Sequence, residues 1–282
     1  MIAKFGLIAA IGCLLAGSGA DRATAFPQPF AGPARGKQLI WSDEFAGSAG
    51  GLPDPTKWSY DTGGGGWGNR ELQYYTPPGG GNAFLDGRGH LKIIARRGRY
   101  TGSDGASGNY TSARLQTLHT FEFTYGLIQA RIKVPKGSGL LPTFWALGSD
   151  AYDGPGSWPA SGEIDAMEVR GSDPRVLYGT IHGPWSWLPG GLGSALHVRT
   201  PLSSRFHTYA VEWSPASIVF LFDGRVYGTV RPSELRPGAA WPFQHPFFLL
   251  LNLTVGGKFG GRPTSSTRFP ASMTVDWVRV WQ

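Results

Sequence analysis

Cysteine is nearly absent from this sequence of 282 residues, in which Cys13 is the single example. Cys13 lies in an apolar stretch near the N-terminus that has the features of a cleaved export signal. Once that stretch is removed, the chain has no thiol, which excludes disulfide bonds, zinc sites built from cysteine and a cysteine nucleophile. Lipid attachment through Cys13 is not favoured, because residues 10–12 lack the leucine that usually stands three residues before a lipidated cysteine.

Hydrophobic runs long enough to cross a membrane are also missing. The N-terminal apolar run covers residues 5–16, whereas a transmembrane helix needs about 20 apolar residues. Lys4 before this run and the small residues Ala23-Thr24-Ala25 after it match the start and the cleavage site of a signal peptide. We therefore predict a signal peptide at 1–25, a secreted or periplasmic protein without membrane association after cleavage, and a flexible Pro- and Gly-rich N-terminal segment at 26–37.

Charged residues make up only 16% of the chain, and no stripe of Lys and Arg of the kind used by nucleic-acid-binding proteins is visible. The net charge of +7 falls to +6 without Lys4, Asp21 and Arg22, and such a basic balance favours acidic polymers. The densest basic run, RRGR at 96–99, is interpreted as a solvated strand end. We expect no nucleic-acid partner, and nothing in the sequence indicates any state other than a monomer.

Glycine, proline and aromatic residues are abundant, with 43 Gly, 22 Pro, 11 Trp, 10 Tyr and 16 Phe. Turn formers mixed with aromatics indicate an all-β protein of many short strands, without long helices. Strand-like runs occur at 91–96, 125–134, 176–183, 207–214, 217–230, 247–255 and 273–281. Asp223-Gly224 predicts a hairpin turn inside one of them. Because no repeat and no second composition block is present, we predict a single antiparallel β-sandwich.

Three long glycine-rich segments, 61–82, 148–162 and 183–198, are expected to be loops, which at this length are usually functional or disordered. They carry six aromatic residues, namely Trp67, Tyr74, Tyr75, Trp158, Trp185 and Trp187. A flat ring beside glycines can stack on the apolar face of a sugar, or it can anchor its loop to the core. The sequence leaves both interpretations open.

The segment GEIDAME at 162–168 places three acids within six residues. On a strand, Glu163 and Asp165 project from one face, and a regular strand would turn Glu168 to the other face. A β-bulge at Ala166-Met167 would return Glu168 to the face of the first two acids. Bulges are common next to active sites because they re-aim a side chain in this way.

Clustered carboxylates suit glycoside hydrolysis, in which one acid attacks the anomeric carbon and a second protonates the leaving oxygen. Repulsion between them raises at least one pKa and keeps that acid protonated near neutral pH. The alternatives are a calcium site or a solvated acidic strand. Calcium usually takes its acids from a flexible loop and not from a strand that carries Ile and Met between them. The cluster therefore favours catalysis.

The longer segment WPASGEIDAMEVRG, at 158–171, resembles the signature of family 16 glycoside hydrolases in the bulged form typical of laminarinases, which are endo-β-1,3-glucanases. Further blocks resemble that family in its order: LIWSDEF (39–45), GNRELQYYT (68–76), YTSARLQT (110–117), YGLIQARIKVPKGSGLLPTFWALG (125–148), GTIH (179–182), FHTYAVEW (206–213), PFFLLLNLTVGG (246–257) and VDWVRVWQ (275–282). The resemblance implies a catalytic domain at 38–282. Its implied fold is a concanavalin A-like jelly-roll β-sandwich of two curved antiparallel sheets with a concave substrate cleft.

The resemblance also implies roles for individual residues. Glu163 matches the nucleophile, Asp165 the assisting acid and Glu168 the general acid/base of a retaining, double-displacement mechanism. His182, in GTIH, matches a histidine near the catalytic acids. The positions that match sugar-contacting residues are Asn69, Arg114, Trp145, Trp158 and Asn252, of which the two tryptophans would stack on glucosyl rings.

The family needs no cofactor for catalysis, and many members bind a structural calcium ion on the convex face. Glu44, Gly87 and Asp276 lie in the matching blocks and are the candidate ligands, because oxygen ligands from distant segments suit calcium.

Two departures from the family pattern affect the expected substrate. Leu141 and Thr143 stand in a segment that commonly reads Trp-Pro-Ala-Phe-Trp, and Thr254 and Phe259 replace small and Trp residues. We expect a β-1,3-glucan substrate and polysaccharide as the partner. Mixed-linkage glucan, agar or carrageenan as substrates and transglycosylation remain alternatives within the family. A carbohydrate-binding module without activity is disfavoured because both glutamates are present.

Overall fold

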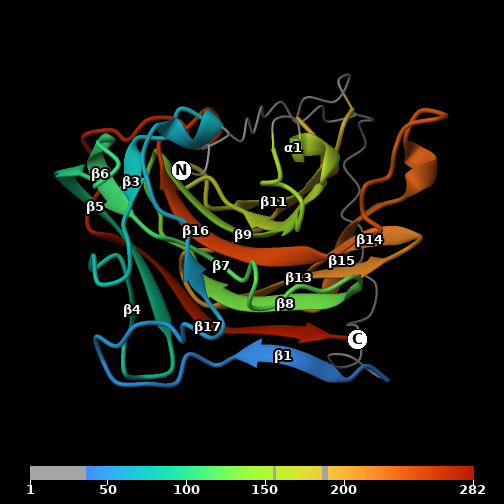
Figure 1. Ribbon diagram of the computed structural model, residues 1–282, viewed down its shortest axis with the longest axis horizontal. Coiled ribbons are helices and arrows are strands. Elements are labelled where there is room, and N and C mark those ends of the chain that lie inside the picture. The colour runs from blue at the N-terminus through green and yellow to red at the C-terminus, as the bar shows by residue number, and fades with distance from the viewer. Residues whose placement is uncertain (1–35, 155–156, 186–189) are drawn as a thin grey trace.

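A computed structural model describes residues 36–154, 157–185 and 190–282 of the chain. The described part is built almost entirely of strands (Figure 1). Their bounds are β1 (Leu39–Asp43), β2 (Ser59–Tyr60), β3 (Gln73–Tyr75), β4 (Ala83–Leu85), β5 (Leu91–Thr101), β6 (Ser107–Ser112), β7 (Arg114–Gln116), β8 (Gly126–Lys133), β9 (Leu140–Gly148), β10 (Glu163–Glu168), β11 (Val176–His182), β12 (Leu192–His197), β13 (His207–Ser214), β14 (Ser217–Phe222), β15 (Arg225–Val230), β16 (Phe247–Val255) and β17 (Ala271–Trp281).

Helical structure in the described residues is limited to three short turns. They are η1 (Gly66–Gly68), α1 (Ser157–Ala160) and η2 (Pro232–Glu234). This confirms the expectation that long helices are absent. Among the described residues, none of these turns has the length and apolar character that a membrane-spanning helix requires.

Two curved sheets stack on one another as nested arcs (Figure 1). The ten-stranded sheet has the order β15-β14-β13-β8-β17-β5-β6-β3, with β1 paired to β17 and β4 paired to β5. The seven-stranded sheet has the order β12-β11-β10-β9-β16-β7-β2. The predicted all-β jelly-roll sandwich is therefore confirmed. One pairing departs from the antiparallel pattern, because β3 and β6 run parallel.

The main hydrophobic core lies between the two sheets, and alternation along each strand decides which residues enter it. In β16, which is buried along its whole length, Leu249, Leu251 and Leu253 pack in the main core. Asn252 and Thr254, between and beyond them, line a cleft on the outer face of the seven-stranded sheet. One face of β16 thus supports the fold, and the other supplies polar groups to the cleft.

Strand prediction from the sequence was accurate where alternation was clear. The runs at 207–214 and 247–255 coincide with β13 and β16. The predicted hairpin turn joins β14 to β15, with φ of 47° at Asp223 and 76° at Gly224, and a turn of this kind requires positive φ at both residues.

The glycine-rich segment at 183–198, expected to be a loop, contains β12. This strand pairs with β11, where Gly193 lies opposite Thr180. A Cβ atom on Gly193 would lie 2.0 Å from the carbonyl oxygen of Gly179. Glycine therefore permits close strand packing here, and the loop prediction for this part was wrong.

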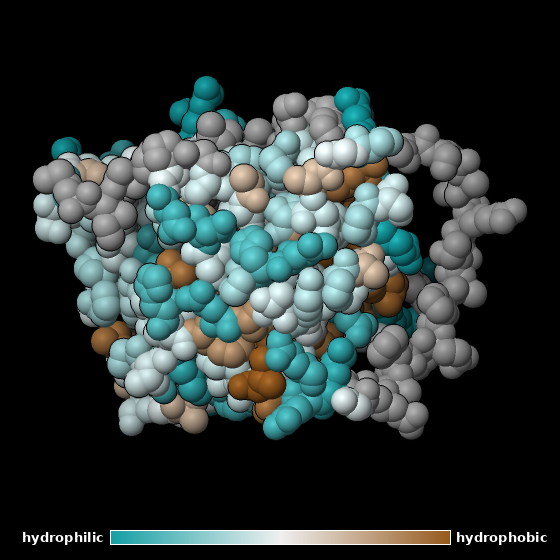
Figure 2. Space-filling model, turned by 45° about the vertical axis from the view of Figure 1, so that its right-hand side comes forward, coloured by the Kyte–Doolittle hydropathy of each residue, from teal (hydrophilic) through white to brown (hydrophobic). Residues whose placement is uncertain are grey.

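Large hydrophobic side chains on the surface are few and scattered, as Figure 2 shows for one face. The exposed ones among the described residues are Leu39, Ile40, Leu52 and Val226. The predicted signal peptide at 1–25 and most of the segment at 26–37 lie outside the described residues. Gln38 is described, and its backbone N–H donates to the carbonyl oxygen of Gln282, so the two described ends of the chain meet.

Candidate active site

The bulge predicted in β10 is present and has the predicted position. Asp165 lies opposite Trp145 of β9, and the next paired residue, Met167, lies opposite Phe144, so Ala166 is the extra residue. Ala166 and Met167 both pack in the main core. The three acids of β10 all line the cleft on the other face of the sheet. Because Glu168 lies three residues after Asp165, the bulge is what keeps it on the face of the first two acids.

Glu163, the first of these acids, is almost fully buried and receives a hydrogen bond from Trp158. The indole Nε1–H of Trp158, in α1, donates to Glu163 Oε2 at 2.7 Å. Burial and the neighbouring Asp165 raise the pKa of Glu163, His182 and the Trp158 hydrogen bond lower it, and together they bring it to about 8. The indole donor thus favours the ionised form of Glu163 against the effect of burial.

Asp165 lies between Glu163 and His182. The Nε2 atom of His182 is 3.3 Å from Asp165 Oδ2, and His182 is the cross-strand partner of Glu163. Burial raises the pKa of Asp165 and a hydrogen bond with Glu163 lowers it, and together they bring it to about 7. One atom from each of the three residues lies within 4.8 Å of the others, a spacing that a metal ion could also bridge. With two acids this close, Asp165 and Glu163 share a proton.

Glu168 differs from Glu163 in having no hydrogen-bond donor directed at its carboxyl group among the described residues. Burial raises the pKa of Glu168 well above its usual value, and the neighbouring Asp165 and Glu163 raise it further, although His182 opposes them. Glu168 is therefore the acid that holds its proton most strongly. Retaining glycoside hydrolysis needs one acid that gives up a proton to the leaving oxygen and a second that is ionised when it attacks, and the indole donor at Glu163 favours ionisation there.

The cleft brings the predicted site residues into one neighbourhood. Four of the five predicted sugar-contacting residues, Asn69, Arg114, Trp145 and Asn252, line it together with the three acids. Trp158, the fifth, contacts Glu163 through its N–H group, and its ring centroid is 6.4 Å from that of His182. The remaining lining residues are Trp67, Glu71, Leu141, Thr143 and Thr254.

Arg114 forms the centre of a layered arrangement of side chains. Its guanidinium carbon lies 4.9 Å from the ring centroid of Trp67 and 4.8 Å from that of Trp145. Its Nε atom is 2.9 Å from Asp61 Oδ2, and an NH2 group donates to the Tyr152 hydroxyl at 2.9 Å. A planar cation between two indole rings fixes the orientation of both. Arg114 therefore positions aromatic surface in the cleft.

The two predicted asparagines make their hydrogen bonds to the protein. Trp145 Nε1 donates to Asn252 Oδ1 at 2.8 Å, and Asn252 Nδ2 donates to Tyr75 Oη at 3.2 Å and Thr254 Oγ1 at 3.1 Å. Asn252 thus orients Trp145, and its contact with sugar stays a prediction.

Asn69 is engaged in a similar way. Its Nδ2 donates to Glu71 Oε1 at 3.1 Å, and its Oδ1 accepts the backbone N–H of Lys258 at 3.0 Å. Asn69 thereby connects the segment that follows η1 to the segment that follows β16. Its contact with sugar is likewise still a prediction.

The sequence profile of glycosyl hydrolases family 16 matches residues 74–279. The chain belongs to this family.

It is 41% identical over 279 residues to the Rhodothermus marinus protein named β-glucanase, covering 96% of this chain and 91% of that protein. It is 36% identical over 259 residues to the glucan endo-1,3-β-glucosidase of Cryptopygus antarcticus, covering 86% and 91% of the two chains. The laminarinase catalytic domain of Thermotoga petrophila RKU-1 superposes with a TM-score of 0.80 at 40% identity, covering 87% of this chain and 98% of that one. The chain is therefore a glycoside hydrolase.

The departures from the family 16 pattern lie within or beside the cleft. Thr254 lines it and bonds through its hydroxyl to Tyr75 at 3.0 Å. Phe259 packs edge-on against Tyr178, with ring centroids 5.0 Å apart. Tyr178 is the cross-strand partner of Glu168 in β11. Both replacements are thus placed where they can affect substrate choice.

Glu71 is a cleft residue that sequence reasoning missed. Its carboxylate accepts hydrogen bonds from Asn69, Gln73 and the Tyr75 hydroxyl. Burial raises the pKa of Glu71 while these three donors lower it. The only signal in the sequence is an isolated acid in the block GNRELQYYT, and a lone acid has no pattern from which a role could be inferred.

The sequence left open whether the aromatic residues of the glycine-rich segments stack on sugar or anchor their segments to the core, and the structure shows a mixture. Tyr74, Tyr75 and Trp185 are buried, and Trp185 packs in the main core, so these three anchor their segments. Trp67 lines the cleft and Trp158 donates to Glu163, so these two are partly buried at the site and not anchored in the main core. Trp187 lies outside the described residues.

The predicted calcium ligands lie near the convex side, but their carboxylates are paired with arginine. Glu44 accepts two hydrogen bonds from Arg279, at 2.8 and 2.9 Å, and Asp276 pairs with Arg131. At Gly87, a Cβ would meet Ala49 at 2.9 Å. These side-chain positions do not fit a calcium ion, because the oxygen ligands face guanidinium groups. Calcium binding stays a prediction that would require both arginines to release their carboxylates.

Proposed function

We propose that the protein is a secreted, endo-acting, retaining hydrolase of β-1,3-glucan. The observation that carries this proposal is the bulge in β10, which places a nucleophile and an acid on one wall of the cleft. The substrate is suggested by relatives at 36–41% identity over most of the chain, both named for action on glucan and one of them for 1,3-β links. Export is suggested by the segment lengths of residues 1–25, which match a signal peptide.

In the first step, a carboxylate oxygen of Glu163 attacks the anomeric carbon while the bond from that carbon to the leaving oxygen breaks. Glu168 transfers its proton to the leaving oxygen, which departs as a hydroxyl group. The sugar is then held as an ester on Glu163, and Glu168 is ionised. The different surroundings of the two acids support this division, since Trp158 donates to Glu163 alone.

In the second step, Glu168 removes a proton from water, and the water oxygen attacks the same anomeric carbon. The ester bond to Glu163 breaks, and Glu163 leaves as a carboxylate. Asp165, which shares a proton with Glu163, stabilises that carboxylate as it re-forms, and His182 supports the anion from the other side. Two displacements at one carbon return the original anomeric configuration.

The cleft supports an extended glucan better than a small sugar. Arg114 orients the indole rings of Trp67 and Trp145 in its wall. Trp145 is buried, so the partly buried Trp67 is the ring that can cover the apolar face of a glucosyl unit. Thr254 and Phe259 leave mixed-linkage glucan, galactans and transfer to sugar acceptors as alternatives, because these residues alter the cleft without touching the acids.

The experiment that tests the proposal is reducing-sugar release by the purified protein from laminarin, mixed-linkage glucan, agarose and κ-carrageenan. The variants Glu163→Gln and Glu168→Gln are measured alongside Glu212→Gln, which alters a half-exposed acid of β13 paired with Lys37. We expect activity on laminarin that falls by at least about 10⁴-fold in the two cleft variants and is unchanged in the control, as for loss of a residue essential to both steps.

Two further measurements distinguish the role of Glu163 from that of Glu168 and test the retaining mechanism. With an activated aryl glucoside, whose leaving group needs no proton, Glu168→Gln should form the glycosyl-enzyme and release a burst of phenol, whereas Glu163→Gln should not. Proton NMR of the first product should show the β-anomer.

Activity confined to a galactan would overturn the proposed substrate, and an α-anomer as the first product would overturn the retaining mechanism. Tight binding without any hydrolysis would favour a carbohydrate-binding module.

A further inference from the structure

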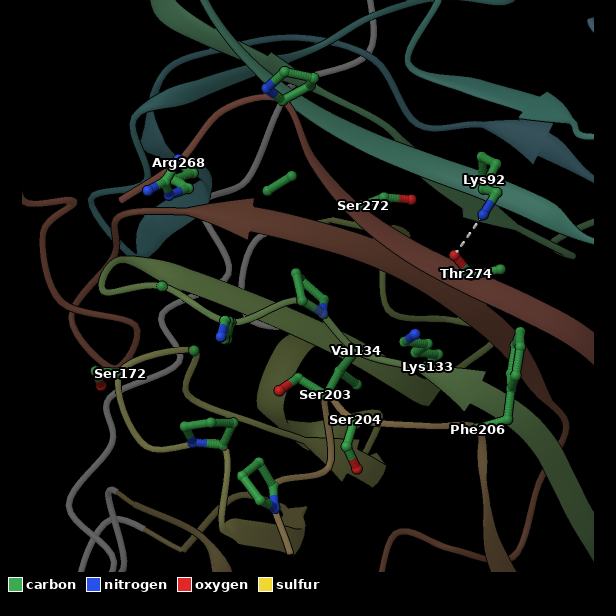
Figure 3. A pocket seen from close by; sticks show the side chains of 18 of the residues that line it. Lys92, Lys133, Val134, Ser172, Ser203, Ser204, Phe206, Arg268, Ser272 and Thr274 are labelled. Carbon is green, nitrogen blue, oxygen red and sulfur yellow. Dashed lines mark hydrogen bonds between the residues drawn. The ribbon is translucent and has the colours of Figure 1, made fainter. Parts of the chain in front are cut away.

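A second cavity, of about 1050 Å³, lies on the ten-stranded sheet, which is the sheet that does not carry the cleft. Side chains from three neighbouring strands meet there: Lys92 from β5, Lys133 from β8, and Ser272 and Thr274 from β17 (Figure 3). The loop before β13 supplies Ser203, Ser204 and Phe206, and the segment before β17 supplies Arg268. The cavity belongs to neither the acids nor the cleft wall, so the proposed function does not account for it.

The charges around this cavity are strongly unbalanced. Five cationic residues line it, namely Arg88, Lys92, Lys133, Lys136 and Arg268, against a single acid, Asp86. Lys92 donates to Thr274 at 2.9 Å and lies 3.9 Å from Asp86, so that acid is already engaged. Among the described residues, no carboxylate lies within ion-pair distance of Lys133, Lys136 or Arg268, and all three are exposed. Like charges kept together without counter-charges favour an anionic ligand.

The basic surface continues beyond this cavity. A smaller one, of about 410 Å³, is lined by Arg96, Arg97, Thr267 and Phe269 and shares Pro270 with the first. Arg96 and Arg97 belong to the run that the sequence analysis interpreted as a solvated strand end. The two cavities together form a basic groove, which we define by Lys92, Lys133, Lys136, Arg268, Arg96 and Arg97. A groove of this kind suits a polymer better than a single small anion.

The aromatic rings of the groove argue against single-stranded nucleic acid, which needs free ring faces for base stacking. Phe206 is stacked by His90, with centroids 5.3 Å apart, and Arg131 lies 4.8 Å from its centre. Phe269 is covered by Arg97 at 5.6 Å and packs against Tyr110. What the groove offers is cations, serine and threonine hydroxyls and proline surface. These groups bind sulfate or carboxylate and the hydroxyls of sugar units.

We propose that the basic groove binds an anionic polysaccharide, carrying sulfate or carboxylate groups, while the cleft on the other sheet acts on its own substrate. The protein would thereby be held on a charged matrix without blocking catalysis. The groove does not depend on the identity of the glucan that the cleft hydrolyses, so the two proposals can fail separately.

The test is binding of the purified protein to dextran sulfate and to polygalacturonate, with neutral dextran as the blank, by calorimetry at about 0.15 M ionic strength. The double variant Lys133→Gln/Lys136→Gln should raise Kd by about tenfold and reduce its salt dependence. The matched control is Arg225→Gln/Arg231→Gln, which removes two exposed cations, one in β15 and one directly after it, at the opposite edge of the sheet. It should change Kd by less than about twofold. Laminarin kcat/KM and the thermal unfolding midpoint should be unchanged in both variants.

Three results would overturn the proposal. The first is no binding to either polyanion. The second is equal weakening by the two double variants, which would mean that only the net charge of the protein matters. The third is tighter binding of single-stranded DNA than of either polysaccharide, which would replace the ligand class by nucleic acid.

Discussion

At the scale of single residues, the proposed function depends on a difference in hydrogen bonding between two glutamates of one strand. Glu163 and Glu168 lie on one strand, both buried, and burial alone would keep both protonated. Trp158 donates to Glu163, and no such donor reaches Glu168 among the described residues. One indole N–H therefore separates the nucleophile from the acid.

Replacing Trp158 by Phe should shift the pH dependence of activity. The change removes a hydrogen bond to an anion, worth about 1.5–3 kcal/mol, and one pKa unit corresponds to about 1.4 kcal/mol. The pKa of Glu163 should therefore rise by about one unit or more. Because Glu163 must be ionised to attack, the acidic limb of kcat/KM against pH should move upward by a similar amount.

The matched control for this prediction is Trp281→Phe, which removes an indole donor to Gln129 at 3.1 Å on the other sheet. It should leave the acidic limb where it is. If Trp158→Phe lowers activity equally at every pH, the indole acts by packing or sugar stacking, and the assigned electrostatic role is wrong.

At the scale of a secondary-structure element, the bulge in β10 decides which way Glu168 points. Asp165 and Met167 keep their partners on β9, so Ala166 is the residue that lacks one. Deleting Ala166 would convert β10 into a regular strand, in which the three acids occupy alternate positions and still share a face. What changes is the local twist and the depth at which the last acid lies.

We expect the Ala166 deletion to lower kcat on laminarin by about 10²-fold, as for a displacement of about 1 Å, without abolishing activity. Ala166→Gly is the control, because it removes the same core methyl group and keeps the bulge; its kcat should stay within about fivefold of wild type. A folded deletion variant as inactive as Glu168→Gln would contradict this expectation and would mean that the bulge itself is required.

At the scale of the whole molecule, the buried acids should impose a pH dependence on stability. Burial raises the pKa of Glu163 from 4.5 to about 8 and that of Asp165 from 3.8 to about 7. The folded protein therefore keeps protons that the unfolded chain releases. The contribution of these two protonated acids to the free energy of unfolding is complete below about pH 4. It is lost as the pH rises through 7 and 8.

Thermal unfolding of the wild type should accordingly show a midpoint that falls by about 5 °C or more between pH 5 and pH 8. Glu163→Gln carries a neutral amide at that position and should reduce the fall, whereas Glu212→Gln should not. An equal fall in all three proteins would show that the buried acids do not control stability in this range. Calorimetry at constant ionic strength provides the measurement.

Features of the fold and the site could be predicted from the sequence where they depend on residues close together in the chain. Alternation is a property of neighbouring residues, so β13, β16 and the hairpin at Asp223-Gly224 could be predicted within a residue or two. The spacing of the acids in β10 predicted both the bulge and its position for the same reason. The family signature lies in contiguous segments and was therefore also readable without a structure.

Other features were decided by contacts between segments far apart in the chain. The strand β12 lies in a glycine-rich segment, and its Gly193 is explained only by the Gly179 carbonyl group that it approaches on β11. Glu71 became a cleft residue because Tyr75 and its other neighbours direct their donors to it. The carboxylates of Glu44 and Asp276 pair with Arg279 and Arg131, which lie more than a hundred residues away in the sequence.

The same division holds for the two functional surfaces. The sequence by itself determined the sandwich and the three catalytic candidates, because strand periodicity and the close spacing of acids are patterns of neighbouring residues. Only the tertiary structure placed Trp158 against Glu163, stacked Arg114 between two indoles and gathered the cations of β5, β8 and the segment before β17 into one groove. Burial and the geometry of distant groups set pKa values and ligand surfaces, and neither is a property of a linear pattern.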